Sequence, residues 1–145
     1  MIKNKVIKLD IGCGERKKKG FVGIDIDPNS DADIIASALD LPIENDSIDE
    51  IQSSHLIEHF LPKETQRFFD EIYRVLKRGK LANIKIDKDW TKKRLLAKDS
   101  THKYRYKTKE IKKMLEKFSY KKVKDKIFFF RLYQPRRKIF IKLIK

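Results

Sequence analysis

The sequence predicts an α/β fold, with a Rossmann-like, mostly parallel sheet, reduced helices between the first strands and an antiparallel hairpin at the C-terminal end. Two observations lead to this prediction. The apolar run Val6–Ile11 continues directly into Gly-Cys-Gly at residues 12–14, and a second run, Phe21–Ile26, carries Asp25 near its end. Such runs are typical of buried parallel strands with a ligand crevice at their carboxyl ends. The length of 145 residues suits a single domain, predicted to span residues 1–145.

Three further apolar runs extend the predicted sheet: Ala32–Ala36, Ile48–Ser53 and Leu81–Ile86. Only the six residues Glu15–Gly20 lie between the first two strands, whereas a parallel crossover usually takes a dozen or more. We therefore expect a turn or a single coil there in place of a helix, and one face of the sheet thinly covered.

Two helices are expected after the fourth strand. The first spans Pro62–Arg78, because Pro62 suits the first helical position and Gly79 suits the left-handed residue that ends a helix. Its apolar stripe consists of Phe68, Phe69, Ile72, Val75 and Leu76. The second is expected to begin with Thr108 as its N-cap. It is expected to bury Ile111, Met114, Leu115 and Phe118.

A long polar loop and a hairpin complete the chain. The loop covers Asp87–Lys107, and its aromatic residues suit either a stacking platform for bases or packing in the core. These residues are Trp90, Tyr104 and Tyr106. The runs Val123–Tyr133 and Lys138–Ile144 predict two antiparallel strands at an edge of the sheet.

Charge is unevenly distributed along this basic chain, whose net charge is +15. Residues 21–60 contain ten acids and no Lys or Arg, whereas residues 61–145 contain 29 basic and nine acidic residues. A basic half favours polyanions, anionic small molecules or anionic membrane surfaces. A lysine-rich composition explains the charge equally well, because Lys outnumbers Arg about three to one and phosphate recognition favours Arg.

The location is predicted from one cysteine and from the lack of long apolar runs. Cys13 alone excludes an internal disulfide and suits the reducing cytoplasm. No apolar run approaches the ~20 residues that a membrane-spanning helix needs. We expect a cytoplasmic protein without a membrane span.

Ordered motifs over about residues 6–120 resemble the class I S-adenosylmethionine-dependent methyltransferases, and in particular their compact type 11-like subgroup. Asp-Ile-Gly-Cys-Gly at 10–14 and Gly-Ile-Asp at 23–25 are similar to the first two strand ends of the family. Residues 39–51, then Ser-His-Leu-Ile-Glu-His-Phe at 54–60, then residues 71–79 are similar to its later segments. The resemblance implies a methyltransferase that uses S-adenosylmethionine.

The resemblance also implies roles for individual residues. Asp10, Gly12 and Gly14 would shape the cofactor loop with Cys13 between the glycines. Asp25 would bind the ribose hydroxyls, and Ile26 would pack on the adenine. The other implied cofactor-binding residues are Ser37, Ala38 and Leu39 beside the adenine and Ser54 beneath the methyl donor. Because Gly12 would leave room for the ligand, a Gly12→Val change is expected to block binding without unfolding the chain.

Histidines are the candidate catalytic residues. A donor that is already activated mainly has to be aligned with its acceptor, but an oxygen or neutral nitrogen acceptor must also lose a proton. Histidine suits that step near neutral pH. The candidates are His55 and His102, followed by His59; His102 also suits a purely structural hydrogen bond.

Other interpretations of the same residues remain open. A nicotinamide site would normally use a third glycine and a helix for which this chain has little room. His55, Glu58 and His59 match a zinc-peptidase pattern, but Pro62 follows so soon that the helix would be short, and no metal is expected. The methyl acceptor is not specified, and nucleic acid is one class that the basic half suits. Alternatively, the chain is a non-catalytic scaffold that binds RNA or a partner protein through that half.

Overall fold

The computed structural model describes residues 6–87, 101–128 and 136–145. Within these residues the chain forms one seven-stranded sheet in the order β3-β2-β1-β4-β5-β7-β6. The strands are β1 (Lys8–Ile11), β2 (Val22–Asp25), β3 (Ile34–Ile35), β4 (Ile48–Ser54), β5 (Leu76–Asp87), β6 (Tyr120–Phe128) and β7 (Arg136–Ile144).

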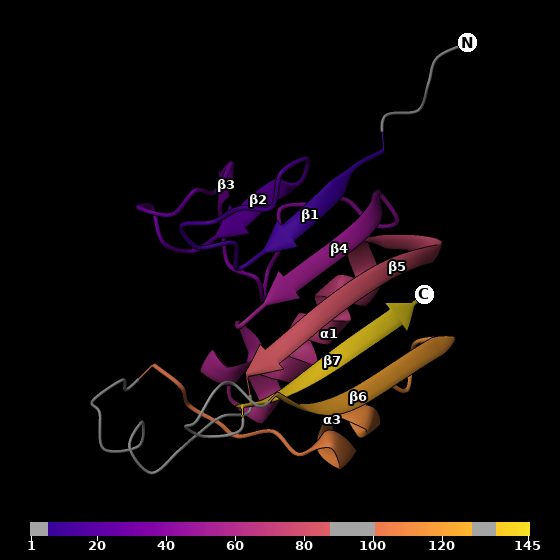
Figure 1. The fold of residues 1–145 in the computed structure, drawn as a ribbon. Helices are drawn as coiled ribbons and strands as arrows, with labels where there is room; N and C mark the ends of the chain where they lie inside the picture. Colours follow the sequence, from indigo (N-terminus) through magenta and orange to yellow (C-terminus); the bar gives the residue numbers. More distant parts are fainter. Residues whose placement is uncertain (1–5, 88–100, 129–135) are drawn as a thin grey trace.

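The sheet is parallel from β3 to β5 and antiparallel at its other end, where β7 lies between β5 and β6 (Figure 1). This confirms the predicted fold class, including the C-terminal antiparallel pair. The carboxyl ends of the five parallel strands all meet at one edge of the sheet. In sheets of this kind, ligands bind at that edge.

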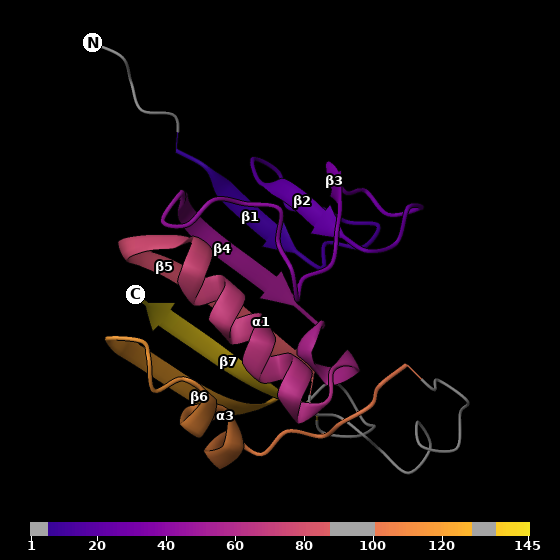
Figure 2. The same cartoon turned by 180° about the vertical axis from the view of Figure 1, so that it is seen from behind.

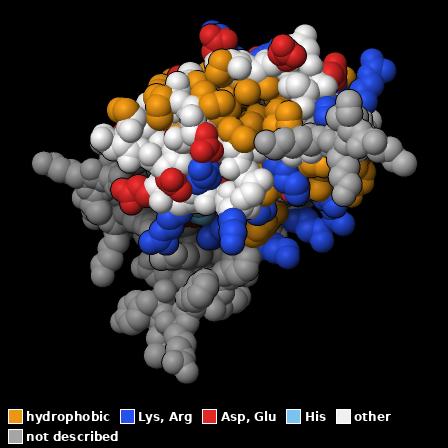
Figure 3. Space-filling model, turned by 90° about the horizontal axis from the view of Figure 1, so that it is seen from above, with side chains coloured by type: hydrophobic (Ala, Val, Ile, Leu, Met, Phe, Trp, Pro, Cys, Tyr) orange, Lys and Arg blue, Asp and Glu red, His pale blue; other side chains and the backbone are white. Residues whose placement is uncertain are grey.

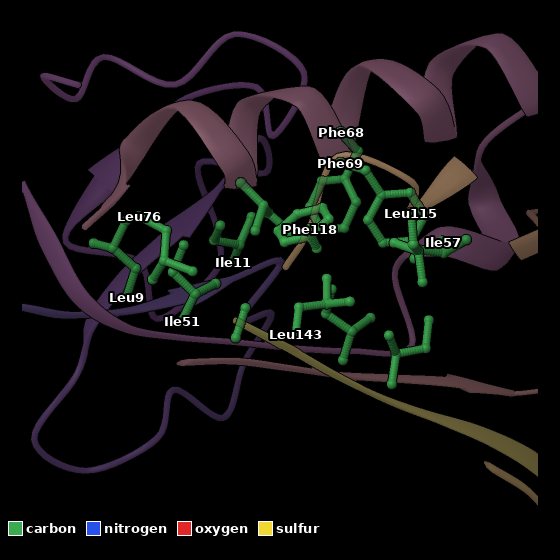
Figure 4. Packing of buried hydrophobic residues seen from close by; sticks show 14 of the residues in the cluster. Leu9, Ile11, Ile51, Ile57, Phe68, Phe69, Leu76, Leu115, Phe118 and Leu143 are labelled. Carbon is green, nitrogen blue, oxygen red and sulfur yellow. The ribbon is translucent and has the colours of Figure 1, made fainter. Parts of the chain in front are cut away.

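Both described α-helices, α1 (Pro62–Val75) and α3 (Thr108–Met114), pack on the same face of the sheet (Figure 2). The core lies between them and the strands, with Phe68 and Phe69 of α1 above Leu9 and Ile51 (Figure 4). No described helix covers the opposite face, because the links from β1 to β2 and from β2 to β3 contain none. The predicted loss of these crossover helices is confirmed.

The first predicted helix ends earlier than expected. It stops at Val75, and Leu76 already belongs to β5, where it is fully buried opposite Ile48. Burial of Leu76 in the sheet therefore decides the boundary against three more helical residues. Gly79 does take a positive φ of 72°, but it lies in a bulged part of β5, between the residues that pair with Ile48 and Glu50.

The second helix begins one residue earlier than predicted and is short. Thr108 is its first residue and Lys107 is the N-cap, whose N–H donates to Glu110 at 2.8 Å. The helix ends at Met114, which is half-buried. The other three residues expected to be buried are buried, namely Ile111, Leu115 and Phe118.

The structure decides between the two interpretations of Tyr106. Its ring is buried, and its hydroxyl lies 2.7 Å from Thr65 Oγ1 and donates to the Phe60 carbonyl at 2.7 Å. The Tyr104 ring packs 4.7 Å away, centroid to centroid. Tyr106 is thus a core residue and not part of a stacking platform. Trp90 and the predicted strand end at 129–133 lie outside the described residues.

The described helices include none that is both long and apolar enough to span a membrane.

Candidate active site

The loop after β1 provides open space at Gly14. Gly12 and Gly14 have φ values of 70° and 55°, which side chains rarely adopt. The Gly12 N–H donates to the Ile24 carbonyl at 2.8 Å, which ties the loop to β2. A Cβ built on Gly14 would meet no atom within 4 Å. The space beside Gly14 is therefore free of other protein atoms.

Asp25, at the end of β2, points into this loop. One carboxylate oxygen accepts the Gly14 N–H at 2.8 Å, and the other accepts the Asp27 N–H at 3.0 Å. Each oxygen can still accept a second bond, so the half-buried carboxylate is fixed in place and able to bind a sugar diol. The following residue, Ile26, is 71% exposed and offers an apolar surface next to it.

Gly12 packs against another segment of the chain. A Cβ at this position would lie 2.9 Å from two methyl carbons of Leu56, in the segment after β4. The space beside Gly12 is thus already filled by the protein itself, and its φ is positive as well. Gly12→Val would therefore strain the backbone and displace Leu56, so an effect on ligand binding could not be separated from an effect on stability. Gly14 is the position at which a ligand could be blocked selectively.

Two carboxylates, one buried and one exposed, hold the link between β1 and β2, which has no helix. Asp10 is buried and accepts the Lys18 N–H at 2.8 Å. Asp33 accepts the Lys17 ammonium at 2.8 Å and the Gly23 N–H at 2.7 Å, and these two bonds lower its pKa. Sequence reasoning missed Asp33, because only the fold brings it to Lys17, inside the short link, and to Gly23, in β2.

The environment of Cys13 keeps its thiol protonated. Partial burial, together with the nearby carboxylates of Asp25 and Asp10, raises the pKa of its thiol from 9.0 to about 11. A nucleophilic cysteine needs the opposite environment. Cys13 therefore acts as a small neutral side chain, and a Cβ on Gly23 would lie only 2.9 Å from its Sγ.

The segment after β3 lies beside Asp25. The Ala36 N–H donates to the Asp25 carbonyl at 2.9 Å, and the next three residues follow directly. Ser37 Oγ accepts the Leu39 N–H at 3.2 Å, and both residues are half-buried, as is Ala38. The predicted adenine-side residues are thus adjacent to the predicted ribose-binding acid.

His55 lies at the end of β4, immediately after the exposed Ser54, in a positive-φ conformation (φ 58°). Its N–H donates to the Lys85 carbonyl at 2.9 Å, which fixes the turn. Its Nδ1 lies 3.3 Å from Glu58 Oε1 and 3.9 Å from Asp87 Oδ2, while its side chain is 40% exposed. The imidazole is therefore held by two acids on one side and open to solvent on the other.

Glu58 is the residue of this site that sequence reasoning did not assign a role. It is fully buried, its Oε1 accepts the Asp87 N–H at 3.2 Å, and its Oε2 has no hydrogen-bond partner among the described residues. The sequence did contain a signal for Glu58, because it is an acid that follows two apolar residues and lies between His55 and His59. Asp87 could not be linked to it from the sequence, because the two residues meet only across β4 and β5.

The other two histidines pair with each other. The rings of His59 and His102 are 4.8 Å apart, edge to face, and His59 Nδ1 lies 2.9 Å from the Thr101 carbonyl oxygen. The short 3₁₀ helix Ile57–His59 contains both Glu58, which lies beside His55, and His59, which contacts His102. Within the described part of the chain, no three or more His, Cys, Asp and Glu side chains group as metal ligands.

The sequence profile of the methyltransferase domain family matches residues 9–83, more than half of the chain. The chain belongs to this family. It is accordingly an S-adenosylmethionine-dependent methyltransferase by family, and the glycine loop, Asp25 and the end of β4 all fall within the matched residues. A search of curated protein sequences found no match.

Solved structures have the same fold at low sequence identity. A SAM-dependent methyltransferase from Archaeoglobus fulgidus is 18% identical, with a TM-score of 0.76 over 99% of this chain and 87% of that one. Phosphoethanolamine N-methyltransferase 2 from Haemonchus contortus, solved with S-adenosyl-L-methionine, is 16% identical with a TM-score of 0.76, over 100% of this methyltransferase and 50% of that chain. A putative methyltransferase from Haloferax volcanii, in complex with the Trm112 activator, is 14% identical with a TM-score of 0.65, over 96% of this chain and 82% of that one.

Proposed function

We propose that this methyltransferase binds S-adenosylmethionine between Gly14 and Asp25 and transfers its methyl group to an anionic acceptor, of which nucleic acid is the class that fits best. One observation carries the cofactor assignment: the Asp25 carboxylate lies 2.8 Å from the Gly14 N–H, beside space that no side chain fills. A sugar with two adjacent hydroxyls suits that carboxylate.

The residues at this edge match the parts of the cofactor. Asp25 would accept the ribose hydroxyls, and the exposed Ile26 would pack against the adenine. The loop residues Asp10, Gly12, Cys13 and Gly14 would border the amino acid part, and Ser37, Ala38, Leu39 and Ser54 would complete the site. The bound cofactor supplies a methyl group on a sulfonium that is already activated, so the chain has to hold donor and acceptor in line and exclude water.

His55 is the proposed general base. Its ring is partly exposed at the carboxyl end of β4 and can reach a proton on an acceptor oxygen or nitrogen. Glu58 and Asp87 lie on its Nδ1 side and would favour the tautomer that carries the proton there, which leaves Nε2 as the acceptor. Glu58 and Asp87 are thus positioning residues. His102 and His59 are the second choice, because they contact each other.

The alternative is a non-catalytic scaffold that binds RNA or a partner protein through the basic C-terminal half. Calorimetry with S-adenosylhomocysteine separates the two: we expect micromolar binding, and millimolar or absent binding would favour the scaffold. The acceptor is tested by incubating the protein and methyl-labelled S-adenosylmethionine with cytoplasmic extract, which matches the predicted location. We expect the label to enter the RNA fraction. Label only in neutral small molecules would contradict the proposed acceptor class.

The proposed base is tested with His55→Gln, which keeps the size and polarity of the side chain. Methyl transfer should fall about 10²–10⁴-fold if the acceptor must lose a proton, while S-adenosylhomocysteine binding should stay within twofold of the parent. His59→Gln, from the same segment, is the comparison variant and tests the second-choice base. Equal losses in both variants would exclude His55 as the base.

The cofactor pocket is tested with Gly14→Ala against Gly20→Ala. Both glycines have positive φ, 55° and 82°, and a Cβ at either would meet no protein atom within 4 Å. Both changes should therefore cost a similar ~1–2 kcal/mol of backbone strain. Only Gly14→Ala should weaken S-adenosylhomocysteine binding, and equal binding by the two variants would show that the pocket lies elsewhere.

A further inference from the structure

Lysines dominate the open face, by which we mean the outward side chains of β5, β7 and β6 on the side without helices. On this face, lysines occupy three consecutive outward positions of β6. They also occupy two of the four outward positions of β7 whose side chains the structure describes. The six lysines of the face are Lys85, Lys122, Lys124, Lys126, Lys138 and Lys142, with Asp87 as the acid on the same side of β5. Figure 3 shows Lys and Arg side chains gathered along the lower margin of the molecule.

Lysines also stand directly opposite one another across β6 and β7. Lys122 pairs with Lys142, and Lys126 pairs with Lys138. Like charges in such positions destabilise a sheet. Among the described residues, Lys122, Lys124 and Lys142 form no ion pair with an acid. The fold therefore tolerates a repulsion that a bound polyanion would relieve.

Protection of a sheet edge does not explain this pattern. Lysines on an edge strand discourage pairing with other chains, and β6 is at the edge of the sheet. However, Lys138 and Lys142 are on β7, which is paired on both sides. Elsewhere on the same side of the sheet, Lys8 of β1 has an acid opposite it, Glu50 of β4, at 2.7 Å.

A hollow of about 350 Å³ on the open face connects these lysines to the end of β4. One row of paired residues crosses it: Ser54, Lys85, Phe140 and Lys124, on β4, β5, β7 and β6 in turn. The row is about 14 Å long, since neighbouring strands lie ~4.8 Å apart. The ammonium of Lys126 lies 5.7 Å from the centre of the Phe140 ring. The half-buried ring of Phe140 thus lies between lysines. The row begins at Ser54, the residue next to His55.

We propose that the open face binds single-stranded nucleic acid, with the lysines on its phosphates and a base against Phe140, and leads the strand to the carboxyl end of β4. Phosphate contacts by lysines and stacking on aromatic rings are the two contacts that such strands offer to a protein. The proposal rests on the proposed acceptor class but not on catalysis, because binding can be measured without methyl transfer.

A membrane surface fits the open face less well. Proteins that lie on membranes insert an apolar face beside their basic residues. Of the large hydrophobic side chains that are exposed in the described residues, only Tyr120 belongs to the three strands of the open face. The others are Val6, Ile7, Ile26, Ile35 and Leu61.

The test uses a fluorescein-labelled 15-nucleotide single-stranded RNA of mixed sequence and anisotropy at 50–200 mM NaCl. The triple variant Lys122→Gln, Lys124→Gln, Lys142→Gln should bind at least tenfold more weakly at 100 mM salt. Its slope of log affinity against log salt should be smaller by about 2, since each phosphate contact contributes about 0.7. The matched control is Lys109→Gln, Lys112→Gln, Lys113→Gln on the exposed side of α3, with the same change in charge. It should lose less than threefold.

Phe140→Leu tests the stacking contact separately. RNA affinity should fall about five- to hundredfold with an unchanged salt slope, while binding of dextran sulfate should not change. The proposal is overturned if the α3 control loses as much as the open-face variant. It is also overturned if Phe140→Leu leaves RNA binding intact, or if vesicles of phosphatidylcholine with 30% phosphatidylserine are bound more tightly than the RNA.

S-adenosylhomocysteine affinity, measured on the same proteins, separates the two proposals. The open-face variant should keep the cofactor affinity of the parent and should melt at the same or a slightly higher temperature, because it removes the repulsion between Lys122 and Lys142. Cofactor binding without RNA binding would refute only the proposal that the open face binds nucleic acid. RNA binding without cofactor binding would refute the proposed cofactor site but not the proposal for the open face.

Discussion

The two ends of the sheet treat charge in opposite ways. At the β1–β2–β3 end, acids have partners within the protein: Asp25 binds two backbone N–H groups, Asp10 binds one, and Asp33 binds Lys17 and Gly23. At the β5–β7–β6 end, lysines face other lysines across paired strands. Charges at the first end build a loop of defined shape. At the second end, Lys122, Lys124 and Lys142 form no ion pair with an acid among the described residues, which is what the proposed docking of a polyanion requires.

The largest expected effect concerns Cys13 at the acidic end. Because its pKa is raised from 9.0 to about 11, alkylation by iodoacetamide at pH 8 should be about a hundredfold slower than for the same protein in 8 M urea. A thiol whose pKa is raised in the folded state stabilises the fold fully below pH 9.0, and this contribution is lost as the pH rises toward 11. Equal alkylation rates in the folded and unfolded chain would contradict this assignment.

Asp25→Ala should have the second-largest effect. It should change cofactor binding at the β1–β2–β3 end and leave the β5–β7–β6 end unaffected. Loss of charge-assisted hydrogen bonds to a sugar diol should weaken S-adenosylhomocysteine binding about 10–100-fold by calorimetry, and RNA binding should not fall. Removing this carboxylate should also lower the pKa of Cys13 and speed its alkylation. Asp31→Ala, an exposed acid near the same loop, is the control. It should leave cofactor binding unchanged and speed alkylation less than Asp25→Ala does, because its charge contributes less than that of Asp25 to the raised pKa of Cys13.

Lys8→Glu should destabilise the protein. It replaces the 2.7 Å ion pair with Glu50 by two like charges on neighbouring strands. We expect the free energy of unfolding in urea to fall by about 1 kcal/mol, within the range of cross-strand pairs. An unchanged midpoint would mean that charges on this side of the sheet are screened, and would weaken the contrast between the two ends.

Lys122→Glu should stabilise the protein, in contrast to Lys8→Glu, and its effect should be the smallest of the four. It turns a like-charged pair with Lys142 into an ion pair, so the free energy of unfolding should rise by a few tenths of a kcal/mol. The same change should weaken RNA binding. A variant that is more stable and binds RNA less well is expected only where a surface has retained repulsion for the sake of a ligand.

Much of the architecture could be predicted from local patterns. The glycines at 12 and 14, the acid at 25 and the six-residue link predict a parallel sheet with a ligand edge and a missing helix, because each is a property of a few neighbouring residues. The end of α1 could not be predicted, because Val75 and Leu76 are equally apolar and only pairing with Ile48 makes Leu76 part of a strand.

The sequence by itself determined the glycine loop at residues 12–14, the acid that faces it and the separation of negative and positive charge along the chain. Only the tertiary structure decided which charges meet. Insertion of β7 between β5 and β6 sets Lys142 opposite Lys122, and pairing of β4 with β5 brings Asp87 to His55 and Glu58. The alternation of a strand tells which side chains share a face, but strand order and register, which arise from packing of the whole core, choose their neighbours.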